Sequence, residues 1–381
     1  MKYSLLCVTF YTILITQIYY SSSQDFLLGA WLPYWKCKET LRVASAHHSL
    51  FDQLSPFSYE LNPQGKIVDT FKKNSHAWKS FFHKCHLRNI KIIPTIFSTN
   101  TQLLAMLLLN SSTREKHVNE LMSLVLNNKF DGININYERI KPEARSGFVA
   151  FIKQLSQQLH KHNKLLCCCT GGRVSDSSTG LFVNKQEATK CLGSCAPSVS
   201  LNPGKGAQAQ KYKKALVRYC DQIHLMGYDE WGTPYQYSPD YLKSGYYISH
   251  SSTQWLEAII QYALSYIPAN KLVLGIGTYG LEFTIDPKTA LKRFYFKKMR
   301  NVSYPQAQAL AKQYRVTPKR TAGGELAFTY QLEDKTRYVC FMDAQAIANR
   351  IALAKKHKLK GAYIFKLDGL EDDAVWPLLA T

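Results

Sequence analysis

Acidic side chains are scarce in this chain: 27 Asp and Glu residues stand against 48 Lys and Arg residues, and the formal net charge at pH 7 is +21. A balance of this sign attracts polyanions such as nucleic acid, anionic lipid surfaces and acidic cell-wall polymers. The basic residues are scattered, however, and no run of them is interleaved with aromatic residues as in a nucleic-acid groove. We therefore favour a basic, solubilising surface and expect no nucleic-acid partner.

Motifs of common metal, nucleotide and nucleophile sites are also missing: there is no H-E-x-x-H pair, no Walker loop and no G-x-S-x-G elbow. Residues 275–280 match G-x-G-x-x-G, but residues 282–287 do not open a helix, and no acid follows at the spacing that ribose binding needs. Cys191 and Cys195 lack a second ligand pair at zinc spacing. We expect neither a cofactor nor a metal, and interpret residues 275–280 as a tight loop at a barrel rim.

Long apolar runs are absent beyond the N-terminus. Lys2 precedes a largely apolar stretch over residues 4–20, and three serines at 21–23 supply small residues for cleavage before Gln24. This pattern is typical of a signal peptide, and the stretch is short for a membrane span. We expect residues 1–23 to be removed and the product to be secreted, periplasmic or extracellular, without a stable membrane span. An uncleaved anchor is the alternative.

Cysteines are more frequent than an ordinary core needs, and one of the ten, Cys7, lies in the expected signal peptide. Export favours disulfide bonds, and the odd number that remains leaves at least one thiol free. Cys191 and Cys195 are spaced for a local bridge. Residues 167–169 are three consecutive cysteines in an apolar strand-like run, where alternate thiols serve as small core residues.

Strand-like and helix-like runs alternate along the chain, which predicts βα units and a parallel sheet. Helices are expected over residues 145–162, 253–267 and 343–357, the last capped by Asp343. Eight strands are expected at 26–31, 53–59, 91–97, 132–137, 164–170, 222–226, 271–275 and 361–365. The fold class is therefore α/β, a (β/α)8 TIM barrel, and 381 residues suit a barrel with an insertion.

Two segments interrupt this alternation. Residues 171–210 are rich in Gly, Ser, Pro and Lys and predict a long loop after the fifth strand. Residues 281–341 are too long for one crossover between the seventh and eighth strands. They contain a helical run near 305–314 and a hairpin, 326–332 and 336–341, turning at Asp334-Lys335. We predict a small α+β module inserted at 281–341.

The most informative run is residues 131–138, DGININYE. In a strand its side chains alternate: Ile133, Ile135 and Tyr137 point one way, and Asn134, Asn136 and Glu138 point the other. Burying three unpaired polar groups would cost roughly a few kcal/mol each. These side chains therefore line a cavity or belong to a site.

Two further strand ends carry polar residues, in Met226-Gly227-Tyr228-Asp229 and Phe365-Lys366-Leu367-Asp368. Barrel chemistry sits at the carboxyl ends of the strands, so these groups are expected to converge with Glu138 on one mouth. The alternative for Asp229 and Asp368 is that they cap the helices that follow. For Glu138, with two asparagines below it, we favour a functional role.

With its flanks, the polar strand resembles the signature of glycoside hydrolase family 18, which includes chitinases, chitobiases and peptidoglycan N-acetylglucosaminidases. The carrying motif is FDGININYE at 130–138, supported by SPFSY at 55–59, MGYDE at 226–230 and KLVLGIGTYG at 271–280. Residues 341–344 and 361–367 are similar to the spore-wall and LysM-associated branch. The resemblance covers nearly all of residues 24–381, as one hydrolase barrel.

The resemblance implies a substrate-assisted retaining mechanism in which the substrate's own N-acetyl oxygen is the nucleophile. Glu138 would be the proton donor, position 136 would orient the acetamido group, and Tyr228 would bond its carbonyl. The implied substrate-binding residues are Asp131, behind the polar strand, Asn134, Met226, Asp229, Trp231 and Phe365, the floor beneath the sugar.

Three positions depart from the family pattern. Asn136 stands where Asp is usual, which removes a preorganised negative charge and roughly 10²–10³ in rate. Phe365 stands where Trp is usual and offers less stacking area and no N–H. Cys340 replaces an aromatic residue usual in the inserted module.

Two functions follow from this resemblance. The first is an exported glycosidase of the chitinase or N-acetylglucosaminidase type, weakened by Asn136. It would act on β-linked N-acetylglucosamine glycans, with peptidoglycan favoured over chitin because a basic protein is drawn to an anionic wall. The second is a chitin-binding, chitinase-like lectin with little or no turnover, which Asn136 and Phe365 favour. The sequence does not choose between endo and exo action or set the oligomeric state.

Overall fold

A computed structural model of the chain describes residues 26–71, 75–172, 214–230, 236–237, 249–288 and 293–380. The expected signal peptide, most of the expected loop at 171–210 with Cys191 and Cys195, and the site candidate Trp231 lie outside these residues.

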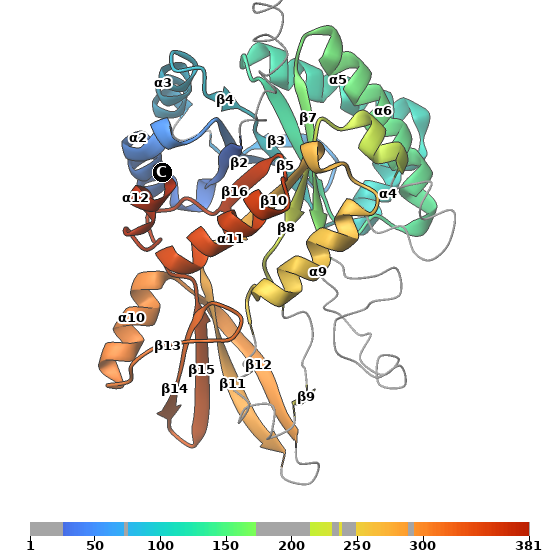
Figure 1. Cartoon of the computed structure of the whole chain (residues 1–381). Helices are drawn as coiled ribbons and strands as arrows, with labels where there is room; N and C mark the ends of the chain where they lie inside the picture. Colours follow the sequence, from blue (N-terminus) through green and yellow to red (C-terminus); the bar gives the residue numbers. More distant parts are fainter. Residues whose placement is uncertain are drawn as a thin grey trace, which may run out of the picture.

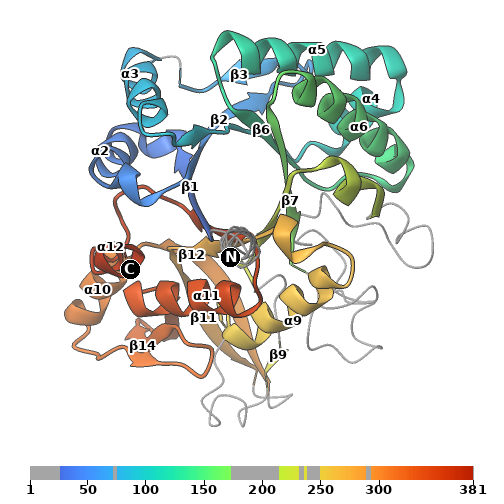
Figure 2. The same ribbon diagram turned by 45° about the horizontal axis from the view of Figure 1, so that its top comes forward.

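Eight parallel strand positions close into a barrel within the described part of the chain, as the sequence predicts (Figures 1 and 2). Closure is made by β1, which pairs with β2 on one side and with β16 on the other. The third position is split in two around Pro94, which cannot donate to the ladder. The barrel strands are β1 (Leu27–Pro33), β2 (Gln53–Leu61), β4 (Lys91–Ile92) with β5 (Thr95–Ser98), β6 (Gly132–Tyr137), β7 (Leu165–Gly171), β8 (Gln222–Met226), β10 (Leu272–Gly277) and β16 (Gly361–Phe365). A short antiparallel strand, β3 (Ile67–Asp69), extends β2.

Helices surround the barrel (Figure 2). The three helices predicted from periodicity are confirmed as α6, α9 and α11. The Asp343 side chain caps α11 by accepting a hydrogen bond from the Ala346 N–H at 3.0 Å. The helices are α2 (Cys37–His47), α3 (Ser75–His86), α4 (Thr101–Leu109), α5 (Ser111–Asn127), α6 (Arg145–Lys161), α9 (Thr253–Leu264), α11 (Ala344–Lys356) and α12 (Val375–Leu379). None of those in the described residues is long and apolar enough to cross a bilayer.

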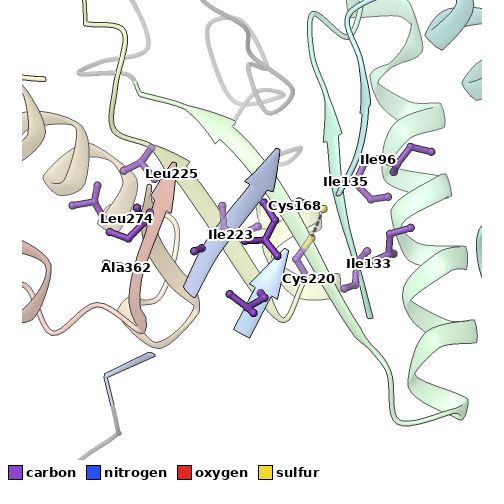
Figure 3. Close-up of a cluster of buried hydrophobic side chains, with 14 of the residues drawn as sticks. Ile96, Ile133, Ile135, Cys168, Cys220, Ile223, Leu225, Leu274 and Ala362 are labelled. Carbon is purple, nitrogen blue, oxygen red and sulfur yellow. Dashed lines mark hydrogen bonds between the residues drawn. The ribbon is translucent and has the colours of Figure 1, made fainter. Parts of the chain in front are cut away.

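The apolar core lies between the barrel wall and the helices (Figure 3). Ile133 and Ile135 of β6 point into it, which confirms the predicted alternation, and Cys168 of β7 lies beside them. The sulfur atoms of Cys168 and Cys220 are 3.2 Å apart as thiols. Among the described cysteines, Cys85, Cys167, Cys168, Cys220 and Cys340 are buried and outside any disulfide. The local bridge expected between Cys191 and Cys195 lies outside the described residues.

At the amino ends of the strands, one device recurs. An Asp just before a strand accepts a hydrogen bond from a backbone N–H of the neighbouring strand, at 2.8 Å in each case. The pairs are Asp52 with Leu28, Asp131 with Ile92 and Asp221 with Leu166. Carboxylates bonded to N–H groups in this way fasten strand to strand at the closed end of the barrel.

The insertion between β10 and β16 forms a second, six-stranded sheet together with β9 (Gln236–Tyr237), in the order β13-β14-β15-β11-β12-β9. It begins at Gly280, three residues after β10 ends, so it extends from the carboxyl-end face of the barrel. Its elements are β11 (Gly280–Lys288), β12 (Arg293–Val302), α10 (Tyr304–Gln313), β13 (Lys319–Arg320), β14 (Leu326–Leu332) and β15 (Lys335–Phe341). The predicted hairpin turn is wrong by one residue. Leu332 pairs with Lys335, and Glu333 adopts a left-handed φ of 55°, so the turn is Glu333-Asp334.

Candidate active site

Strand β6 carries the polar side chains up the inside of the barrel. Its register with β5 places Asn134 beside Thr95 and Asn136 beside Phe97. Asn134 is fully buried and bonded within the barrel, since its amide donates to the Thr95 hydroxyl at 3.3 Å. It therefore supports the strand from inside the barrel. Glu138 follows the strand and lies at its carboxyl end, with its backbone N–H donating to the Ser98 carbonyl at 2.9 Å.

The side chain of Asn136, unlike that of Asn134, has an oxygen that accepts no hydrogen bond from the described residues. This oxygen is Oδ1, and the side chain is 5% exposed. A buried amide oxygen without a donor costs about 1–3 kcal/mol. Two residues below Glu138, it is an acceptor suited to an N–H group.

Tyr228 reaches the same region from the end of β8. Its ring stacks on Phe365 from β16, with centroids 4.9 Å apart and planes at 14°. Burial raises the pKa of the Tyr228 phenol well above its usual range, and the charges of Asp229 and Glu138 raise it further. The phenol is therefore neutral and able to donate a hydrogen bond.

Asp229 is held in a left-handed conformation, with φ at 59°. Asp tolerates this region better than most residues. The Tyr279 hydroxyl donates to its Oδ1 at 2.8 Å, and the ring of His250 lies on the same side, with Nδ1 3.6 Å from that oxygen. The helix-cap alternative is not found for Asp229, because Ser252 caps α9. Asp368 is likewise no cap, and its carboxylate contacts the Lys366 ammonium.

Aromatic rings form the floor inside the mouth. Trp31 of β1 contacts Phe365 edge-on with centroids 5.8 Å apart, and Tyr363 lies 4.8 Å from Trp31. Met226 is buried in the same cluster. His224 lies 4.5 Å from Tyr363, and burial lowers the pKa of His224 to about 3, so its imidazole is neutral. Sequence reasoning missed His224, although β8 alternates Gln222, His224 and Met226 as β6 alternates its own polar residues.

A second aromatic feature is a row at the rim. Trp35, just beyond β1, is 46% exposed and contacts Phe57 edge-on at 5.8 Å. Phe57 in turn lies 5.4 Å from Phe97, the register partner of Asn136. Trp35 and Phe97 stand next to the carboxyl ends of β1 and β5, and this pattern in the sequence could have indicated the row.

Asp131 requires a correction. It precedes β6, seven residues before Glu138, and a strand rises about 3.3 Å per residue, so the two acids lie at opposite ends of the barrel. Its carboxylate accepts from the Ile92 N–H at 2.8 Å and contacts His86 Nε2 at 2.9 Å. Asp131 is therefore a structural residue at the closed end and not a substrate-binding one.

Cys340, the third departure from the family pattern, is fully buried on β15. It packs with Leu281 and Phe283 in an apolar cluster against which Phe365 also rests. At this position the thiol serves as a small apolar group behind the floor.

Comparisons with known proteins find relatives among glycosylases. At the level of sequence, the chain is 24% identical over 289 residues to an uncharacterized glycosylase, YvbX, of Bacillus subtilis, covering 74% of this chain and 70% of that protein. It is 26% identical over 280 residues to the cortical fragment-lytic enzyme of Bacillus subtilis, covering 73% of this chain and 56% of the enzyme.

Solved structures show the same fold. A class V chitinase from Pseudomonas fluorescens Pf-5 aligns with a TM-score of 0.71 at 20% identity, covering 93% of this chain and 99% of that one. The Bacillus cereus spore cortex-lytic enzyme SleL aligns with a TM-score of 0.69 at 20% identity, covering 93% and 74%.

The family model for glycosyl hydrolases family 18 matches residues 56–369, a span that holds the polar strand and both other strand ends of the mouth. Family and relatives together support glycoside hydrolase activity. The chain belongs to the glycosyl hydrolases of family 18.

Proposed function

We propose that this protein cleaves β-linked N-acetylglucosamine glycans by a substrate-assisted retaining mechanism. The observation that carries the proposal is the Oδ1 atom of Asn136, a buried acceptor without a donor among the described residues, two positions below the carboxyl group of Glu138. An acetamido group offers the matching N–H, and its carbonyl oxygen matches a neutral phenol such as Tyr228.

The residues divide the reaction between them. Glu138 protonates the glycosidic oxygen as the bond to the anomeric carbon breaks, and the acetamido carbonyl oxygen attacks that carbon from the other face. Asn136 accepts the acetamido N–H and Tyr228 donates to its carbonyl, so the nucleophile is held in line. The ionised Glu138 then takes a proton from the water that opens the cyclic intermediate, which returns the acid to its starting state.

Peptidoglycan is the favoured substrate and chitin the alternative. Two relatives are named as cortical fragment-lytic enzymes and a structural neighbour as a spore cortex-lytic enzyme, whereas other neighbours are chitinases. A formal net charge of +21 favours an anionic wall polymer through long-range attraction.

A lectin with little turnover is the second candidate. Asn136 is neutral, so it orients the acetamido group without stabilising the positive charge that develops on the cyclic intermediate. Losing such a charge lowers the rate by roughly 10²–10³. On this proposal the protein is a weakened hydrolase. If the loss of rate is complete, it binds N-acetylglucosamine glycans without cleaving them.

The deciding experiment measures release of reducing ends from chitin oligomers and from purified peptidoglycan in parallel, with Glu138→Gln as the matched control. Cleavage by the wild type that the variant loses supports the hydrolase. Binding of chitooligosaccharides by both forms without cleavage by either supports the lectin. Cleavage that the variant retains contradicts the assignment of Glu138.

Export is a separate proposal, motivated by the charged and apolar pattern of residues 2–23. N-terminal sequencing of the protein recovered outside the cell tests it. A start near Gln24 supports cleavage, and a start at Met1 contradicts it.

A further inference from the structure

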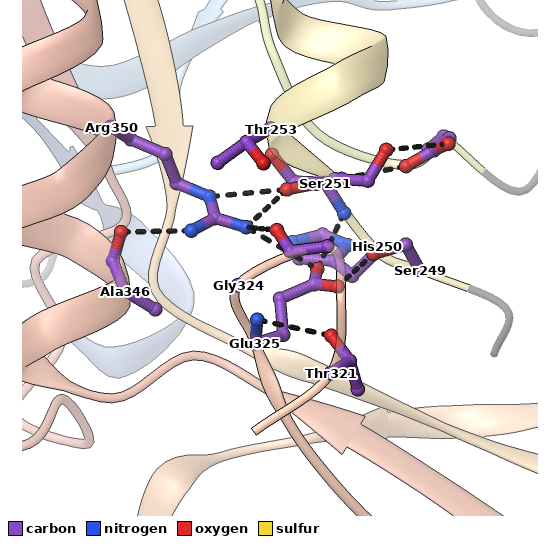
Figure 4. Close-up of polar contacts among 12 residues, drawn as sticks. Ser249, His250, Ser251, Thr253, Thr321, Gly324, Glu325, Ala346 and Arg350 are labelled. Atoms are coloured by element: carbon purple, nitrogen blue, oxygen red, sulfur yellow. Dashed lines mark hydrogen bonds and ion pairs between the residues drawn. The ribbon is translucent and has the colours of Figure 1, made fainter. Parts of the chain in front are cut away.

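The segment that leads into α9, residues 249–252, is buried over residues 250–252 and is held by side chains from separate parts of the chain (Figure 4). Glu325 accepts from the Ser251 N–H at 2.6 Å and contacts the Ser249 hydroxyl. Arg350 of α11 donates from Nε to the Ser251 carbonyl at 3.1 Å. We call Glu325, Arg350 and the segment 249–252 the clamp.

The clamp has a third side chain at the barrel itself. Glu230, two residues after Tyr228, accepts from the Ser252 N–H at 2.7 Å and from the Ser252 hydroxyl at 3.0 Å. Two carboxyl groups and one guanidinium thus bond the backbone of Ser251 and Ser252 and the hydroxyl of Ser249, with Arg350 fully buried. Buried polar groups are retained where hydrogen bonds of this kind satisfy them.

Glu325 belongs to the inserted module and not to the barrel. It lies between β13 and β14, where its backbone N–H donates to the Thr321 hydroxyl at 3.3 Å and the Thr321 N–H donates to its carbonyl at 2.8 Å. Arg350 Nη2 also bonds the Gly323 carbonyl at 3.2 Å. The clamp is therefore a direct polar connection between the module and the barrel.

His250, inside the clamped segment, points toward the mouth. It is fully buried, and its Nδ1 accepts the backbone N–H of Asp229 at 3.4 Å. An N–H donor at Nδ1 requires the lone pair there, so the neutral ring carries its proton on Nε2. The ring lies 4.3 Å from the Tyr279 ring, whose hydroxyl holds Asp229.

Gly277 leaves room for this arrangement. A Cβ atom at position 277 would lie 2.5 Å from His250 Nε2 and 3.2 Å from Tyr228 Cβ. The imidazole and the base of Tyr228 therefore share one space against β10. A shift of His250 would displace Asp229, which is already in a left-handed conformation, and Tyr228 with it.

We infer that His250 is a positioning residue for Asp229 and Tyr228, and that Glu325 of the inserted module holds it in place through the clamp. On this inference the inserted module helps to orient Asp229 and Tyr228 in the proposed active site. The expected loss of kcat rests on the proposed function. The positioning of Asp229 and Tyr228 by His250 does not.

The kinetic test changes His250. His250→Ala is expected to lower kcat on a chromogenic N-acetylglucosamine oligosaccharide by about tenfold or more, with KM within about twofold, because a loosened Tyr228 affects the transition state most. His250→Asn, whose Oδ1 can accept the Asp229 N–H in place of Nδ1, is expected to recover most of the loss. The inference would be overturned if His250→Ala changed KM as strongly as kcat, or if His250→Asn failed to recover the kcat that His250→Ala loses.

The second arm changes the module. Glu325→Gln is expected to lower kcat in the same way, but less. The matched control is Glu282→Gln, another buried module acid, which accepts from Arg300 Nε at 2.6 Å and from the Tyr330 hydroxyl at 2.5 Å and lies outside the clamp. Equal kcat losses in the two variants would show a general effect of module stability and contradict the connection.

A readout without turnover separates this inference from the proposed function. 3-Fluorotyrosine placed at position 228 is expected to give one fluorine resonance in the otherwise unchanged protein and a shifted or split resonance in His250→Ala and Glu325→Gln. An inactive wild type with this change would reject the hydrolase and keep the positioning role. An unchanged resonance in a folded His250→Ala protein would reject the positioning role, whatever the activity.

Discussion

The two ends of strand β6 carry acids that the fold treats in opposite ways. Asp131, at the start, accepts a backbone N–H of β4 at 2.8 Å and contacts His86 at 2.9 Å. Glu138, at the end, lies at the mouth, where its charge raises the pKa of the Tyr228 phenol. Asp residues at three strand starts fasten the backbone of neighbouring strands, whereas the chemistry of a barrel of this kind is expected at the strand ends.

The same contrast appears at neighbouring strands. Asp221 precedes β8 and bonds the Leu166 N–H at 2.8 Å, whereas Asp229 follows β8 and receives the Tyr279 hydroxyl. The end of the strand at which an acid stands does not decide its role alone, since Glu230, which also follows β8, accepts the backbone N–H of Ser252 at 2.7 Å.

The largest effect is expected for Glu138→Gln, which keeps the shape of the side chain and removes its proton. We expect the rate of glycan cleavage to fall by about 10³ or more, since a general acid and the base of the second step are both lost. The measurement is the reducing-end assay, with thermal unfolding to verify that the fold is kept. Asp131→Asn serves as the control from the other end of the strand, and a comparable loss of rate in a folded Asp131→Asn protein would refute the contrast.

Asn136→Asp is expected to raise kcat by about tenfold or more, because it restores a negative charge beside the developing cation. The change also places a second carboxyl near Glu138, so the pH–rate profile is expected to change shape as two carboxyls share a proton. Steady-state kinetics across pH measures both. An unchanged kcat with tighter binding of chitooligosaccharides would favour the lectin.

Asp131→Ala is expected to lower the free energy of unfolding by about 1–3 kcal/mol, because the buried end of β4 loses a charged acceptor for its Ile92 N–H. The kcat of the folded fraction is expected to stay within about threefold of the wild type. Urea denaturation gives the first quantity and active-site-normalised kinetics the second. Asp221→Ala removes the equivalent bond between β8 and β7, to the Leu166 N–H, and is expected to lower stability and preserve kcat in the same way.

The smallest effect concerns pH and the acids of the clamp. Burial raises the pKa of Glu230 from 4.5 to about 8 and that of Glu325 from 4.5 to about 7, with Arg350 opposing both shifts. A raised carboxyl pKa means tighter proton binding in the folded state, so this stability is complete below about 4.5 and is lost as pH rises through about 7–8. We expect the melting temperature to fall over that window and Glu325→Gln to reduce the slope. If Glu325→Gln left the slope of melting temperature against pH unchanged, Glu325 would not contribute to the pH-dependent stability.

Much of this protein could be predicted from its sequence. All eight barrel strands and three helices were predicted from periodicity, since alternation in β6 and the helical period in α6 are local patterns that packing only has to accept. The hairpin turn was misplaced by one residue because the pairing of Leu332 with Lys335 is decided by cross-strand contacts. Pairing of β11 with β12 was not foreseen: Leu281, Phe283 and Ile285 alternate with polar residues along β11, but alternation does not say which strand pairs with it.

By itself, the sequence determined the barrel, the acid at 138, the amide at 136 and the family resemblance. These rest on residue type and spacing along one strand. Only the tertiary structure decided that Asp131 faces the closed end, that Asn136 keeps an acceptor without a donor among the described residues, and that His250 links Asp229 to Glu325. The contacts among these join residues 21 to 74 positions apart, and the unmet acceptor of Asn136 depends on which groups do not contact it. No local sequence pattern encodes either.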